Sequence, residues 1–401
     1  MKSPRLLGMS PRRTAIIGGL MVATGPLSLT LYSPALPAIV TGLGTDDAGG
    51  KLTMSVYFAA FALAQLICGP LSDRYGRRWV GIGFFAIYVI GSLVGALAPT
   101  LEVLLLGRVL QGFGVSAGVA LSRAMVRDQF VGMDAIRILT LVNLILTVAP
   151  AVSPTLGSLI MLVGSWHVMF LVMAGFGLAI IAMLGLGARE TLPETQRTPL
   201  HPVTVIRNYA QLLLAPAFLL PALVLALAFG GFYGFAALLP FVLIDQIGLT
   251  PFQFAMAMLI QTGSFITGNL LAGRLANRLD GPRLVLVGLV FLGLGGLGFA
   301  IGPRLFPDSV LATMAPVSLW MLGLATIGPS ATASAMARYG HMAGSAGALT
   351  GFFQMGGGFL ASLLAIALFP DAHAAMVSLL PILAGLAIAT ALLHRRLYPG
   401  Q

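Results

Sequence analysis

The chain of 401 residues has very little charge and almost no cysteine. Asp, Glu, Lys and Arg make up only 8% of it, whereas a soluble domain carries about a quarter. With so few charged side chains a soluble protein of this length could not cover its surface, so the chain needs lipid around it. The single cysteine, Cys68, excludes an internal disulfide and a cysteine-rich metal site.

Hydrophobic residues make up 58% of the chain and fall into long runs. Because a helix needs about 20 apolar residues to cross the hydrocarbon layer, each run is long enough to span a membrane. The sequence therefore predicts an all-α membrane protein with twelve transmembrane helices, at residues 14–40, 52–72, 79–98, 101–122, 136–163, 166–187, 214–244, 252–274, 283–303, 309–336, 343–369 and 372–394.

The positions of the basic residues test this assignment of twelve spans. An even number of spans places both termini on one side, and nearly all of the 22 Lys and Arg residues then fall on that side. Only Lys51 and Arg304 fall on the other side, and Arg108 lies inside a span. Loops rich in Lys and Arg stay in the cytoplasm. The net charge of +10 is therefore a topology signal, and we expect cytoplasmic termini and no nucleic-acid partner.

The chain also divides into two similar halves. The longest polar break follows the sixth span, which predicts a bundle at 1–187, a cytoplasmic linker at 188–213 and a second bundle at 214–401. The pattern Gly-x-Leu-small-Asp/Asn-Arg begins at Gly69 and again at Gly273, after the second span of each half. Since both copies face the cytoplasm, we expect two six-helix bundles related by a pseudo-two-fold axis along the membrane normal.

The first copy reads Gly-Pro-Leu-Ser-Asp-Arg-Tyr-Gly-Arg-Arg and resembles the loop between helices two and three of the major facilitator superfamily. Glycine at position 76 permits a tight reversal. The resemblance implies a latch that holds the cytoplasmic ends of the halves together, with Asp73, Arg74 and Asp128 as ionic partners. The alternative is that these arginines only set topology. The latch residues are Gly69, Asp73, Arg74, Gly76, Arg77, Arg78 and Asp128.

Span 101–122 contains an arginine about 10 Å along the helix, at Arg108. A buried arginine is costly unless paired or hydrated, so it marks a functional cavity. With Gln111 it resembles the Arg-x-x-Gln-Gly motif of the same superfamily, which implies a role in proton coupling. The alternative is an arginine that snorkels to the interface.

Span 136–163 contains Pro150 and Pro154, which must bend a helix, and Gly157, which allows another helix to approach. This segment resembles the antiporter motif of drug/proton antiporters; a plain packing kink is the alternative. Stretches at 31–37, 123–128 and 190–193 further resemble the bicyclomycin-resistance-like multidrug exporters.

Proton coupling rests on this resemblance alone. Related exporters often carry an acid in the first helix, where this chain has Thr30. The twelve acids all fall in loops or near helix ends, and among them Asp73, Asp128, Glu102 and Asp245 are candidate proton carriers. No carboxylate is expected at the membrane centre, which favours a neutral or anionic substrate over a multivalent cation.

A cavity for drug-like molecules is apolar and aromatic with a few polar anchors. The helices that line such a cavity in this architecture supply its candidates, which are Tyr32, Tyr57, Phe61, Asn143, Thr147, Phe232, Tyr233, Gln261, Phe265, Asn269, Phe353 and Gln354.

These features predict a secondary transporter that exports small amphipathic compounds across the inner membrane by alternating access. A dedicated exporter of a native metabolite, such as a siderophore or amino-acid derivative, remains an alternative. A receptor or assembly protein that does not transport is another. We expect a monomer in the lipid bilayer, no cofactor apart from a proton as coupling ion, no metal and no enzymatic activity.

Overall fold

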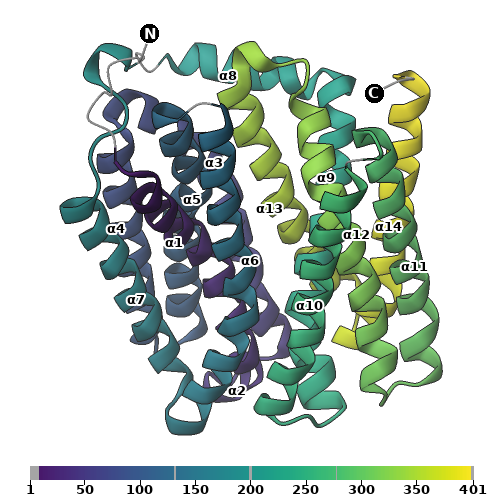
Figure 1. The fold of residues 1–401 in the computed structure, drawn as a ribbon. Coiled ribbons are helices and arrows are strands. Elements are labelled where there is room, and N and C mark those ends of the chain that lie inside the picture. Colours follow the sequence, from purple (N-terminus) through teal and green to yellow (C-terminus); the bar gives the residue numbers. More distant parts are fainter. Residues whose placement is uncertain (1–8, 131, 198–200, 277, 399–401) are drawn as a thin grey trace.

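The computed structural model describes residues 9–130, 132–197, 201–276 and 278–398, and every regular element within these ranges is a helix. Figure 1 shows two bundles of long helices side by side, with both ends of the chain at the same end of the molecule. The predicted all-α membrane fold is confirmed.

The first half consists of six long helices and the short segments that complete them. They are α1 (Pro11–Thr30), the 3-10 turn η1 (Ser33–Ala35), α2 (Leu36–Gly42), α3 (Asp47–Tyr75), α4 (Arg77–Ala96), α5 (Leu101–Gln129), α6 (Gly132–Val163), α7 (Trp166–Ala182) and the π-helical turn η2 (Met183–Gly187).

A linker with its own helix leads into the second half. The elements are the 3-10 turn η3 (Glu194–Gln196), α8 (Pro202–Leu213), α9 (Pro216–Pro240), the π-helical turn η4 (Phe241–Gln246), α10 (Pro251–Leu275), α11 (Gly281–Leu305), α12 (Val310–Met336), the 3-10 turn η5 (Gly340–Met342), α13 (Ala343–Leu368) and α14 (Ala372–Leu397).

Each predicted span corresponds to one long helical segment. In the described part of the chain, eleven segments are long and apolar enough to cross a membrane, and α6 lies at the place of the remaining span. The first span differs from a single helix, since α1 ends at Thr30 and the chain passes through η1 into α2. Pro34 and Pro37 lack a backbone N–H and prevent a continuous helix there.

Packing within each half is extensive, and two pairs of long helices make the most extensive contacts between the halves. In the first half α5 packs against α1, α3 and α4, and in the second half α9 packs against α12, α13 and α14. Between the halves α3 packs against α13, and α6 packs against α10. A two-fold axis that relates the halves exchanges these two contacts, in agreement with the predicted parallel repeat.

Candidate functional site

Arg108 lies in the middle of an aromatic sandwich. Its side chain is 0% exposed. The guanidinium carbon lies 4.4 Å from the ring centroid of Tyr32 and 4.4 Å from that of Tyr57. The two rings come from the segments that follow α1 and begin α3, so three segments meet at one cation. Such contacts stabilise a buried cation by about 2 kcal/mol each.

The polar partners of Arg108 are neutral. Its Nη1 donates to Oε1 of Gln111 at 2.8 Å, and Nε2 of Gln111 donates in turn to the hydroxyl of Ser92 at 2.8 Å. A longer contact of 3.5 Å joins its Nε to the carbonyl oxygen of Thr53. Among the residues that the structure describes, no ion pair involves Arg108. The buried position excludes a snorkelling arginine.

Hydroxyl groups extend this arrangement into the neighbouring helices. The Tyr32 and Thr53 hydroxyls are 2.8 Å apart, and the Tyr57 hydroxyl donates to the carbonyl oxygen of Gly25 at 3.3 Å. The hydroxyls of Ser28 and Tyr88 lie 2.6 Å apart. Together these bonds join α1, α3, α4 and α5 around the cation, and fully connected buried networks of this kind fix side-chain positions.

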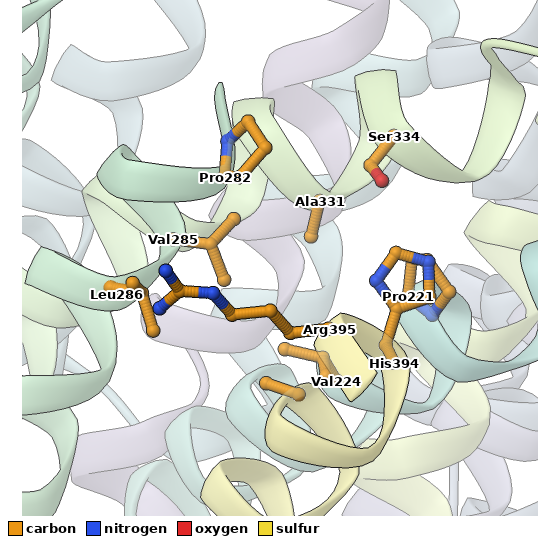
Figure 2. Close-up of a pocket in the computed structure, with 10 residues that line it drawn as sticks. Pro221, Val224, Pro282, Val285, Leu286, Ala331, Ser334, His394 and Arg395 are labelled. Atoms are coloured by element: carbon orange, nitrogen blue, oxygen red, sulfur yellow. The ribbon is translucent and has the colours of Figure 1, made fainter. Parts of the chain in front are cut away.

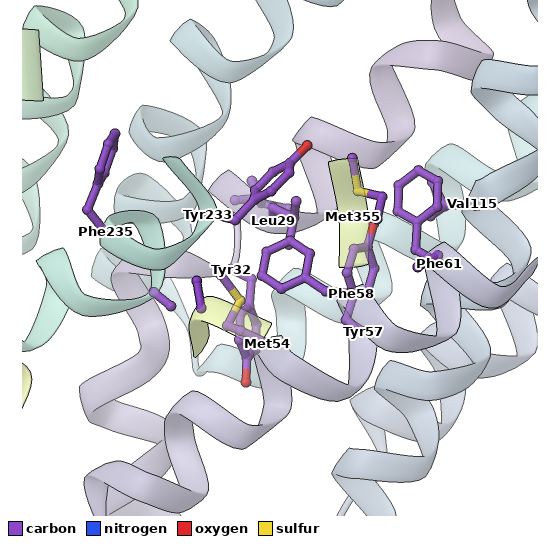
Figure 3. Packing of buried hydrophobic residues seen from close by; sticks show 14 of the residues in the cluster. Leu29, Tyr32, Met54, Tyr57, Phe58, Phe61, Val115, Tyr233, Phe235 and Met355 are labelled. Atoms are coloured by element: carbon purple, nitrogen blue, oxygen red, sulfur yellow. The ribbon is translucent and has the colours of Figure 1, made fainter. Parts of the chain in front are cut away.

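The aromatic cluster reaches the interface between the halves. Phe58 lies 4.6 Å from Tyr233 of α9, measured between ring centroids, and Figure 3 shows the two rings beside each other. The hydroxyl of Ser55 donates to that of Ser362 at 2.6 Å, which ties α3 to α13. A movement of one half relative to the other therefore changes the surroundings of the residues beside Arg108.

The structure brings together part of the predicted cavity. Phe61 lies 6.1 Å from Tyr57, between ring centroids, and Phe232 lies 4.7 Å from Tyr233. Tyr32, Tyr57 and Phe61 thus gather near Arg108, and Phe232 and Tyr233 face them from the second half. The clustering could be anticipated from the helix positions, but the sandwich around the arginine could not.

For the other predicted cavity residues the structure shows no contact with Arg108 or its rings among the described residues. Nδ2 of Asn269 donates to the carbonyl oxygen of Phe265, one turn away on α10, at 2.9 Å. Gln261 is buried, and its Oε1 has no hydrogen-bond partner among the described residues. Phe353 packs near α8 and the start of α9, and the neighbouring Gln354 is half-buried. The side chains of Asn143, Thr147, Pro150 and Pro154 lie outside the described residues.

Gly157 has the role predicted from its lack of a side chain. A β-carbon at this position would collide with the carbonyl oxygen of Leu31 and lie 3.1 Å from the Pro34 ring. Glycine therefore lets α6 approach the break between α1 and α2, next to Tyr32.

The latch loop forms an ionic cluster centred on Arg77. Gly76 ends α3 with a φ of +94°, a conformation that favours glycine, and the chain reverses there into α4. Arg77 is 4% exposed and pairs with Asp73 at 2.5 Å and with Asp128 at 2.9 Å. The resemblance had implied Arg74 as the basic partner, but the guanidinium of Arg74 lies over the ring of Tyr75.

Arg78 connects the same loop to the end of α7. Its Nε donates to the carbonyl oxygen of Leu184 at 2.9 Å, and its Nη2 donates to that of Gly185. Both carbonyls belong to the π-helical turn η2, where the wider winding changes the usual pairing of backbone groups. Arg78 therefore joins η2, which follows α7, to the loop between α3 and α4 by hydrogen bonds.

Glu190 is the functional residue that sequence reasoning missed. Its carboxylate accepts from the backbone amides of Arg77 at 2.8 Å and Arg78 at 3.2 Å, at the start of α4. It also accepts from the amides of Thr191 and Leu192. A carboxylate at a helix N-terminus accepts hydrogen bonds from the free amides, and its negative charge interacts favourably with the positive end of the helix dipole. The Glu-Thr-Leu-Pro stretch had indicated only a family resemblance.

The linker helix α8 is hydrogen-bonded to α3 near the latch loop. The hydroxyl of Tyr209 donates to the carbonyl oxygen of Leu66 at 2.8 Å. Burial, together with the nearby Asp73 carboxylate, raises the pKa of Tyr209 to about 12. The hydroxyl therefore keeps its proton at physiological pH and donates this bond throughout that range.

We expect Glu190→Gln to weaken the latch. Hydrogen bonds to a charged group contribute about 1.5–3 kcal/mol, and a neutral amide at this position retains part of that stabilisation. The melting temperature of the purified protein should fall by several degrees. Glu194→Gln is the matched control, because the Glu194 carboxylate is 85% exposed and pairs only along η3 with Arg197. Equal melting temperatures for Glu190→Gln and the unmodified protein would contradict this role.

Two six-helix halves, joined beside a buried cation, define a membrane transporter of the two-bundle type. A profile described as the Major Facilitator Superfamily matches residues 18–362, and the chain belongs to that family.

Similar proteins agree with this assignment. Multidrug resistance protein D of Escherichia coli (strain K12) is 27% identical over 370 residues, which cover 92% of each chain. A chloramphenicol resistance protein of Pseudomonas aeruginosa is 31% identical over 350 residues, 86% of this chain and 81% of the relative. The crystal structure of a D-xylose–proton symporter shares the fold, with a TM-score of 0.76 at 15% identity over 97% of this chain and 98% of that one.

Proposed function

We propose that this protein exports small amphipathic compounds across the inner membrane, with both termini in the cytoplasm, and that it works as a monomer. Rocking of the two halves would open the space beside Arg108 to one side of the membrane and then to the other. The family and the names of the relatives, which include multidrug and chloramphenicol resistance, support this direction of transport.

The observation that carries the proposal is the fully buried Arg108, held by aromatic rings and an amide beside the interface of the halves. Phe58 and Tyr233 are buried against each other here, and separation of the halves would expose their aromatic faces to a ring-bearing compound. A cation without an acidic partner favours a neutral polar or anionic group on the substrate. Multivalent cations are the least favoured class.

A proton is the coupling ion that we propose. The position that carries an acid in related exporters is Thr30, whose hydroxyl donates to the carbonyl oxygen of Pro26 within its own helix. The acids that remain as carriers include Asp73 and Asp128, which both pair with Arg77. Protonation of either would weaken the ion pairs of Arg77, which join the ends of α3, α4 and α5 at the cytoplasmic end of the first half.

Transport by the purified protein in proteoliposomes tests both parts. Chloramphenicol and a panel of amphipathic dyes would be offered with and without a pH gradient, while a trapped dye reports internal pH. We expect faster uptake with the gradient and a pH change on substrate addition. A flat pH trace during active transport would refute proton coupling. No transport of any panel member would favour the dedicated exporter or the receptor.

A further inference from the structure

A small cavity lies in the second half, at the end of the molecule that carries the chain termini. Its volume is about 50 Å³, and the ends of α9, α11, α12 and α14 enclose it (Figure 2). The lining is mostly apolar, with Val285 and Leu286 on one wall. Its polar lining residues are Ser334, His394 and Arg395, and none of the described residues around it is acidic.

His394 is the buried polar residue among those that line this cavity. The residue is only 8% exposed, and its Nε2 has no hydrogen-bond partner among the described residues. A buried polar atom without a partner costs about 1–3 kcal/mol, so native structures supply a ligand or a water to most of them. A single water needs about 10–15 Å³ of such space, so this cavity has room for a larger polar group.

The charge at this end of the second half favours an anion. The loops and helix ends there carry one acid, Asp280, against the basic residues Arg274, Arg278, Arg283, Arg338, Arg395 and Arg396. The carboxylate of Asp280 is already used, since it caps α11 and accepts from the amide of Arg283 at 3.0 Å. The half therefore has a surplus of positive charge and no acidic side chain to place in the cavity.

The first half shows what the second half lacks. There the carboxylate of Glu190, which follows the last helix, binds the amides that begin α4. The spacing in sequence that relates Gly69 to Gly273 also relates Glu190 to His394, at the end of α14 beside the start of α11. At the position where the first half has Glu190, the second half has His394 beside Arg395 and the cavity, and the start of α11 is capped by Asp280 instead.

We propose that this cavity binds the phosphate group of an anionic phospholipid, with Arg395 and His394 as its polar contacts. The site lies at the helix ends, where lipid headgroups meet a membrane protein, and basic pockets between helices bind such headgroups. The apolar walls suit the glycerol and upper acyl carbons, which a free phosphate ion lacks. This site is separate from Arg108 and does not depend on the transported substrate.

Lipid titration of the purified full-length protein, followed by native mass spectrometry, tests the site. Phosphatidylglycerol should bind one high-affinity site, and Arg395→Gln should raise its dissociation constant about fivefold or more, as expected for one arginine at an anionic headgroup. Arg396→Gln is the matched control, because it removes the same charge from the next residue, which does not line the cavity. Equal weakening by the two variants would overturn the proposal.

Two further arms separate the lipid from other anions. Ser334→Leu fills part of the cavity without a change in charge, and we expect it to displace phosphatidylglycerol while the melting temperature in lipid-free detergent stays unchanged. Inorganic phosphate and phosphatidylcholine should not compete at the same concentration. Competition by either, or undiminished binding to Ser334→Leu, would refute an anionic lipid site at this place.

Discussion

Arg108→Ala should abolish the export that we propose, so that resistance falls to the level of cells without the protein. The substitution removes the cation that lies between Tyr32 and Tyr57 and leaves both rings and Gln111 without their common partner. Arg108→Lys should abolish transport as well, because the compact ammonium group of lysine lacks the planar guanidinium that stacks between two aromatic rings. The measurement is the minimum inhibitory concentration of chloramphenicol or of the best substrate found in proteoliposomes.

The control for this experiment is Arg137→Ala. Arg137 lies on α6 with its side chain 75% exposed and pairs with Asp134, one turn away. Its loss changes the net charge by the same amount and should leave resistance intact. Size-exclusion chromatography of the extracted Arg108 variants separates lost transport from lost folding. Full resistance in well-folded Arg108→Ala would show that the buried cation has no part in transport.

Arg77→Ala should destabilise the protein more than any other substitution in the latch loop. Arg77 is buried between Asp73 and Asp128, and Asp128 is itself only 10% exposed. Removal of one partner from a buried ion pair leaves an uncompensated charge and costs about 3–5 kcal/mol. Thermal unfolding in detergent should show a large fall in melting temperature, and resistance should fall with it.

Arg74→Ala provides the comparison for Arg77. The two arginines belong to the same loop and differ by three positions, but Arg74 is exposed and lies over Tyr75. We expect only a small change in melting temperature for Arg74→Ala. If the two variants lose the same stability, then the pairing of Arg77 with two carboxylates does not hold the latch together.

Much of the fold could be predicted from the sequence because lipid imposes simple rules. The length of each apolar run predicts a span, and the positions of the basic residues predict which loops face the cytoplasm. Both patterns can be found in the sequence without knowledge of any tertiary contact. The break at Pro34 was less predictable. A proline can kink a helix or end it, and the sequence alone does not distinguish the two outcomes.

The site was predictable only in part because its contacts join distant segments. Glu190 lies more than a hundred residues from Arg77, and their contact depends on how α7 packs against α4. Arg74 and Arg77 look alike in sequence, and the reversal at Gly76 decides which one turns inward. Tyr32 and Tyr57 were expected in the cavity, but their rings enclose Arg108 through the packing of three segments.

Two contacts between the halves that lie near Arg108 carry no charge, and this has an electrical consequence. Ser55–Ser362 and Phe58–Tyr233 join the halves without charge, and Arg108 is held wholly within the first half. Separation of these two contacts moves no charged side chain through the membrane field, and a charged contact between the halves, Lys51 over the ring of Phe241, lies near the start of α3. The transmembrane potential, worth about 2.3 kcal/mol per elementary charge per 100 mV, would then act on the cargo and the coupling ion. In a cell with a negative interior, an anionic cargo would leave with the help of the voltage.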